Sequence, residues 1–143
     1  MRRNGFTLVE LLVVITVMAL LATGVVLTLP ASGSEAREAA SRFAARAAAA
    51  RDRAVLTGQP TAVWVSPSGY GFEQWHGGKW QPLDDKPLVQ TDWGAGVATS
   101  VQSRSAVRFD SVGLPDRPLD LVLAENGRET RVGIAATGDV VTP

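Results

Sequence analysis

The sequence has no cysteine, and His76 is the only histidine among its 143 residues. The absence of cysteine excludes disulfide bonds and a thiol nucleophile, so packing alone must stabilise the fold. His76 stands between Trp75 and Gly77, a setting typical of a turn residue and not of a general base. The sequence also contains no Gly-x-Ser-x-Gly elbow and no phosphate-binding loop. We therefore predict a protein that is not an enzyme, with no catalytic residues and no cofactor.

The sequence likewise has no excess of charge, because its 14 basic side chains are balanced by 14 acidic ones. Proteins that bind nucleic acid usually carry a basic patch or stripe. The candidate for such a basic patch is a group of five arginines: Arg37, Arg42, Arg46, Arg51 and Arg53. A solvated helix face explains them better, and we expect no nucleic acid partner.

Four aspartates near the C-terminus do not form the compact loop of oxygen ligands that calcium requires. They are Asp110, Asp116, Asp120 and Asp139. We predict no metal site and assign these residues to loop caps and turns.

Residues 6–29 form a long apolar run in which Glu10 is the only charged residue, and Arg2 and Arg3 precede it. As a helix, these 24 residues would extend about 36 Å, enough to cross a bilayer core of about 30 Å. Since basic residues favour the cytoplasmic side, the N-terminus is expected in the cytoplasm and the remainder outside it. A carboxylate in hydrocarbon is costly, so Glu10 is expected to have a partner and a function.

The residues Gly5-Phe6-Thr7-Leu8-Val9-Glu10 resemble the N-terminal signature of type IV pilins and type II secretion pseudopilins. The resemblance implies that a prepilin peptidase cuts after Gly5, which removes residues 1–5 as a leader, and that the new amine of Phe6 is N-methylated. Residues four apart share a helix face, so Glu10 can meet the Phe6 amine of its own chain. The family implies the amine of a neighbouring subunit, with Glu10 setting the register of assembly.

Two other interpretations of the same segment explain less. A secretory signal peptide usually has a shorter apolar core, and Ala31 after Pro30 makes a poor cleavage site. A simple membrane anchor leaves Gly5-Phe6 beside Glu10 unexplained. We therefore retain an exported soluble binding domain only as a remote alternative.

Residues 30–58 are predicted to form a second, amphipathic helix that packs on a sheet. Ser32 and Glu35 have the spacing of a capping box, and Gly58 with Pro60 supplies a stop signal. Steps of four and three residues draw one apolar stripe along this helix: Ala36, Ala40, Phe43, Ala47, Ala50 and Ala54. A helical spine bent near Pro30 would result.

Residues 59–143 are predicted to form an antiparallel β domain. Its seven expected strands are 61–65, 70–75, 79–83, 106–109, 119–124, 129–135 and 139–142. Gly77-Gly78 and Asn126-Gly127 are hairpin signals, because these residues tolerate a positive φ. Residues 84–105 are expected to form a long loop with at most one strand. The fold class is therefore α+β, a long helical spine packed on an antiparallel sheet or sandwich, as in pilins.

Four tryptophans could line the core, contact other subunits or form a stacking surface for sugars or bases. The four are Trp64, Trp75, Trp80 and Trp93, and a place in the core or in contacts between subunits is favoured. Trp75 and Trp80 are expected to face each other across a hairpin. Trp93, in the irregular loop, is the candidate for an exposed contact residue.

A second resemblance lies in the C-terminal third, in Phe109-Asp110 with Gly113 and in Thr137-Gly138-Asp139. These short motifs are similar to the C-terminal region of H-type minor pseudopilins. The resemblance implies an inner-membrane protein, single-pass, with a periplasmic domain that joins a pseudopilus at or near its tip. Its implied partners are other major and minor pseudopilins, the prepilin peptidase, the inner-membrane assembly platform and the secreted cargo. The alternative is a minor pilin of a type IV pilus, serving assembly, adhesion or DNA uptake.

Overall fold

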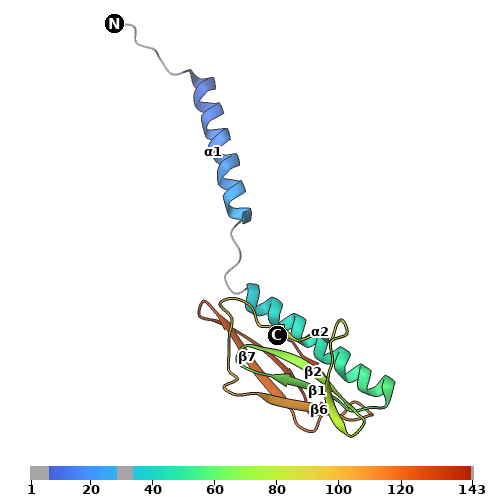
Figure 1. Cartoon of the computed structure of the whole chain (residues 1–143). Coiled ribbons are helices and arrows are strands. Elements are labelled where there is room, and N and C mark those ends of the chain that lie inside the picture. Colours follow the sequence, from blue (N-terminus) through green and yellow to red (C-terminus); the bar gives the residue numbers. More distant parts are fainter. Residues whose placement is uncertain (1–6, 29–33, 143) are drawn as a thin grey trace. The chain divides into compact units, whose positions relative to one another are not determined.

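The computed structural model describes residues 7–28 and 34–142 (Figure 1). The chain divides into two compact units, Met1–Ala31 and Ser32–Pro143. The predicted bend near Pro30 and the predicted capping role of Ser32 fall outside the described residues.

The first unit contains the helix α1, which spans Leu8–Thr28. Thr7 begins it, because its side-chain oxygen accepts a hydrogen bond from the Glu10 N–H at 3.3 Å. The carbonyl of Thr7 accepts the first helical bond, from the Leu11 N–H at 3.2 Å. Within the described ranges, no helix reaches the combination of length and apolarity needed to traverse a membrane.

The second unit is built around the helix α2, Ser34–Thr57, which packs on two antiparallel sheets. The predicted apolar stripe is confirmed, since all six of its residues are completely buried. Five of them are alanines, whose short side chains let the helix backbone lie close to the strands. Figure 1 shows α2 running along the sheets, and its contacts reach β1 and β6 of one sheet and β7, β8 and β9 of the other.

The first sheet has the strand order β3-β2-β1-β6, and β4 pairs with the start of β2. Its strands are β1 Thr61–Val65, β2 Gly69–His76, β3 Lys79–Pro82, β4 Thr91–Asp92 and β6 Ser105–Phe109. The second sheet has the order β5-β7-β8-β9. Its strands are β5 Ala98–Thr99, β7 Leu119–Glu125, β8 Arg128–Ile134 and β9 Val140–Val141. Helices and antiparallel sheets together confirm the predicted α+β class.

All seven predicted strands are present, and both predicted hairpins are confirmed. Asn126 and Gly127 have φ values of 50° and 77°, and Gly77 and Gly78 have values of 60° and 83°. The prediction of at most one strand in residues 84–105 is wrong, because both β4 and β5 lie there. Each has two residues and forms only because a longer strand offers it a partner, a contact that short-range patterns do not reveal.

The prediction that Trp93 is an exposed contact residue is also wrong. Its side chain is 1% exposed, and its indole ring lies 4.8 Å from the Tyr70 ring and 5.6 Å from the Phe43 ring. The indole N–H donates to the carbonyl of Ser66 at 2.9 Å. This bond satisfies the polar atom of the indole, so the ring can fill the core beneath α2.

Glu125, at the end of β7, caps the start of α2. One carboxylate oxygen accepts hydrogen bonds from the N–H groups of Glu35 and Ala36, at 3.1 and 3.2 Å. The first N–H groups of a helix have no partner within the helix, and the helix dipole favours an anion there. The cap therefore comes from a residue 90 positions away in the chain.

We expect Glu125→Ala to lower the free energy of unfolding of the full chain by about 1 kcal/mol, because two helical N–H groups lose their acceptor. Urea unfolding in detergent, followed by circular dichroism, measures the change. Glu125→Gln is the matched control, since its amide oxygen still accepts, and it should lose less. Equal stability of the Ala variant and the unaltered chain would contradict the capping role.

Candidate functional site

Of the residues predicted to direct processing and assembly, the structure describes only Glu10. Arg2, Arg3, Gly5 and Phe6 lie outside the described residues. Glu10 is exposed in the first turn of α1. Within residues 7–28, its carboxylate forms no hydrogen bond or ion pair.

The C-terminal motifs of the sequence meet at Arg51 on α2. A Cβ atom at Gly113 would lie 3.2 Å from Arg51 Cγ and 3.0 Å from Val55 Cγ2, and one at Gly138 would lie 2.5 Å from the carbonyl oxygen of Gly113. The turns after β6 and before β9 thus touch each other and the helix. Glycine is needed at both positions, because φ is also positive, at 84° and 88°.

Hydrogen bonds fix the conformation of each turn. The Asp110 carboxylate accepts from the N–H groups of Val112 and Leu114, at 3.0 and 2.8 Å. Thr137 donates its hydroxyl to the Asp139 carboxylate at 2.9 Å. Asp110 and Asp139 therefore act in turns, as predicted, whereas Asp120 lies within β7.

Arg51 joins the second turn to α2. Its guanidinium donates to the carbonyl of Gly138 at 3.0 Å and lies 3.4 Å from the Asp139 carboxylate. We name this contact of α2 with residues 110–114 and 137–139 the turn junction. It brings together three segments that are far apart in the sequence.

The prediction that all five arginines form a solvated helix face is therefore only partly right. Arg37 and Arg42 are exposed, but Arg51 belongs to the turn junction. Arg53 donates to the Gln74 side chain at 3.3 Å and pairs with Asp85 at 3.7 Å. Arg46 donates to the hydroxyls of Tyr70 and Thr91. Sequence patterns miss these roles because each partner comes from the β domain.

The fold alters the titration of Tyr70. Burial raises the pKa of its hydroxyl above the ordinary value, and the neighbouring positive charge of Arg46 opposes part of that rise. Tyr70 is 1% exposed and contacts the rings of Phe43 and Phe72. We assign it to the core and not to a reactive site.

The free edge of β6 is closed to further strands by two side chains. The Asp116 carboxylate accepts from the Arg108 N–H at 2.9 Å, and the Asp116 N–H donates to the Arg108 carbonyl at 2.9 Å. Arg117 donates to the carbonyl of Ala106 at 2.6 Å. A partner cannot add a strand to this edge without displacing these bonds, so the edge of β6 is a poor candidate for assembly.

The outer face of the first sheet carries three tryptophans, each packed on its neighbours. Trp75 and Trp80 face each other across their hairpin, as predicted, with ring centroids 5.4 Å apart. The guanidinium of Arg104 lies 4.4 Å from the centre of the Trp64 ring and pairs with Glu73 at 2.6 Å. The tryptophan rings of this face therefore contact one another or a cation of the same face.

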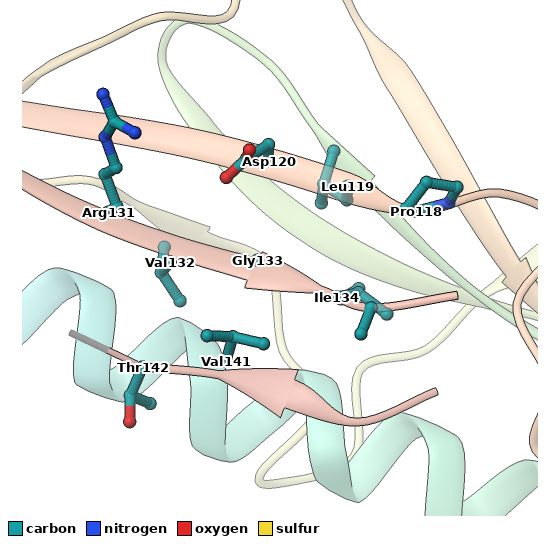
Figure 2. A pocket seen from close by; sticks show the side chains of 10 residues that line it. Pro118, Leu119, Asp120, Arg131, Val132, Gly133, Ile134, Val141 and Thr142 are labelled. Carbon is teal, nitrogen blue, oxygen red and sulfur yellow. The ribbon is translucent and has the colours of Figure 1, made fainter. Parts of the chain in front are cut away.

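A groove of about 450 Å³ lies on the second sheet, between β7, β8 and β9 (Figure 2). Gly133 lines it, and a Cβ there would lie 2.5 Å from the Leu119 carbonyl oxygen, so the close approach of β7 requires glycine at this position. Asp120, Arg131 and Val141 border the groove and are exposed. Across the described ranges, no group of three or more histidine, aspartate or glutamate side chains is placed to hold a metal ion.

Two segments of the chain match known protein families. Residues 39–138 match the family described as type II transport protein GspH, and residues 1–26 match the prokaryotic N-terminal methylation motif. No curated protein is similar enough in sequence to count as a match.

Solved structures share the fold. The minor pseudopilin EpsH of Vibrio cholerae has 23% identity and a TM-score of 0.64, covering 77% of this chain and 97% of its own. Escherichia coli GspH has 24% identity and a TM-score of 0.61, with coverage of 78% and 89%. The type IV minor pilin FimU of Pseudomonas aeruginosa has 17% identity and a TM-score of 0.59, with coverage of 76% and 88%. The predicted pilin-like fold is confirmed.

The turn junction predicts unequal costs for two glycine substitutions. Gly138 and Gly127 both have a positive φ, but a Cβ at Gly127 meets no atom within 4 Å. We expect Gly127→Ala to cost about 1 kcal/mol of unfolding free energy from backbone strain alone. Gly138→Ala should cost about 3 kcal/mol, because the added atom also strikes the Gly113 carbonyl. Urea unfolding of both full-length variants tests this, and equal costs would refute the close contact of the two turns.

Proposed function

Because the chain belongs to the family of type II transport proteins GspH, we propose that it works as a minor pseudopilin of type II secretion. The observation that carries the proposal is the match of residues 39–138 to that family, together with an N-terminal methylation motif in residues 1–26. A secretion subunit needs both segments. The N-terminal motif serves entry into a filament, and the domain that matches the family serves contact with neighbouring subunits. An exported soluble domain has no use for the methylation motif.

Maturation follows from the N-terminal residues. Prepilin peptidase cleaves between Gly5 and Phe6, and the amine of Phe6 is then N-methylated. Arg2 and Arg3 hold the leader in the cytoplasm until cleavage. Residues 6–29 hold the subunit in the inner membrane as a single pass, and the domain formed by residues 59–143 lies in the periplasm with the amphipathic helix of residues 30–58. The apolar composition of residues 6–29 supports this arrangement.

Glu10 sets the register of assembly by pairing with the Phe6 amine of a neighbouring subunit. Two charges that are each costly in an apolar environment neutralise each other, and only one axial offset between subunits brings them together. The exposed carboxylate of Glu10, unpaired within residues 7–28, supports this role.

The subunit acts by assembly and not by catalysis. It leaves the membrane through the assembly platform and joins other major and minor pseudopilins at or near the tip of a periplasmic pseudopilus. There it helps to push secreted proteins across the outer membrane. The likeness of its fold to the minor pseudopilin EpsH supports a minor position.

A minor pilin of a type IV pilus is the second candidate, because the fold also resembles that of the type IV minor pilin FimU. The two roles share the N-terminal features and differ in what the filament does. The family match favours secretion.

We expect Glu10→Ala to leave cleavage intact but to lower incorporation into filaments about tenfold or more, because a charge-assisted pair is lost. Immunoblotting of sheared filaments and of membranes measures both quantities. Thr16→Val is the control, since the Thr16 hydroxyl donates to the Leu12 carbonyl of its own helix. Normal assembly and secretion by Glu10→Ala would refute the role of Glu10.

Deletion of the chain should abolish or strongly reduce release of exoproteins into the medium and leave twitching motility and transformation unchanged. Enzyme assays of culture supernatants and motility plates of the same strain measure the two functions. The reverse pattern would establish the pilus role in place of secretion.

A further inference from the structure

Four exposed aliphatic side chains gather where α2 ends. In residues 34–142, six large apolar side chains are exposed, and four of these belong to the last turn of α2 or to the turn after β6. They are Val55, Leu56, Val112 and Leu114, exposed by 49%, 85%, 69% and 49%. We name them the end patch. Single exposed apolar residues are ordinary, but a cluster of this kind marks an interaction site.

The end patch borders a hollow of about 490 Å³ beside the turn junction. Val55, Leu56 and Val112 contribute apolar walls, and Arg51 and Asp52 contribute polar ones. Gly113 fixes the position of the turn against α2, because a Cβ there would meet Val55 at 3.0 Å. The hollow is therefore shaped by packed elements and does not depend on a free loop.

The rim of this hollow is acidic. Asp52 lines the hollow, and its side chain is 62% exposed. Asp139, whose side chain is 75% exposed, adjoins the hollow because it accepts the hydroxyl of Thr137, which lines it. Asp110 adjoins it through the N–H of Val112 and is exposed as well. Among the described residues lining the hollow, the one cation is Arg51, which already contacts both Asp52 and Asp139. The last turn of α2 contains no basic residue, so the negative end of the helix dipole adds to the same field.

We propose that the end patch binds a lysine or arginine side chain carried on an apolar segment of a neighbouring pseudopilin. The inference rests on the proposed function, which supplies the neighbour. The alkyl stem of the incoming side chain packs against Leu56 and Val112, and its cation meets Asp52 and Asp139. Neither an anionic lipid nor a nucleic acid suits an acidic rim, so charge complementarity selects a cationic partner.

The test uses the full-length processed chain in detergent, with each other full-length minor pseudopilin of the same secretion system as the probe. Leu56→Ser removes apolar area, and Asp52→Lys reverses the rim charge. The matched controls are Val141→Ser, which changes the groove of Figure 2, and Asp84→Lys, which reverses an exposed loop charge. Leu56 is 85% exposed, so its substitution should not impair folding, and circular dichroism verifies this.

We expect one probe to bind, with its Kd raised at least tenfold by Leu56→Ser and by Asp52→Lys and unchanged by the two controls. Binding should also weaken as salt is raised. The inference is overturned if no probe binds, if the controls weaken binding as much, or if the two test variants bind normally. It is also overturned if light scattering shows that the end patch mediates only self-association.

Complementation of a deletion strain separates this inference from the proposed function. If the unaltered chain restores exoprotein release and Leu56→Ser does so equally well, the docking site is refuted and the secretion role stands. If deletion causes no defect in release, the secretion role itself fails. We expect restoration by the unaltered chain and by Val141→Ser, and at least a tenfold loss of release with Leu56→Ser.

Discussion

The close packing of α2 on both sheets is the constraint on which the rest of the globular unit depends. The two sheets are separate in their strand pairing, and α2 contacts both of them. Its buried stripe is almost entirely alanine, with Phe43 as the one large side chain. Short side chains allow this approach, and Phe43 fills the remaining space against Tyr70 and Trp93.

Much of this arrangement could be predicted from local sequence patterns. The spacing of Ala36, Ala40 and Phe43 predicts the buried face of α2, and Asn126-Gly127 predicts its hairpin, because both signals act over a few residues. Trp93 could not be placed in this way. Its burial depends on Phe43, Tyr70 and the carbonyl of Ser66, which only the complete fold brings to it.

In the candidate site too, some features can be predicted from local sequence and others depend on the complete fold. Glu10 can be singled out from sequence because an isolated carboxylate in an apolar run is costly. The glycines at 113 and 138 can be recognised as family motifs, but the sequence does not say that they touch each other over Arg51. That contact holds the turn after β6 in place, and so presents the end patch at the end of α2.

We propose, above all, that the chain enters a filament as a processed pseudopilin. The most direct measurement is the N-terminal residue and mass of the protein purified from native membranes that contain an active prepilin peptidase. We expect a chain that begins at Phe6 with a methylated amine. A chain that begins near Ser32 would contradict it, because signal-peptide cleavage would have removed the assembly segment and released the domain.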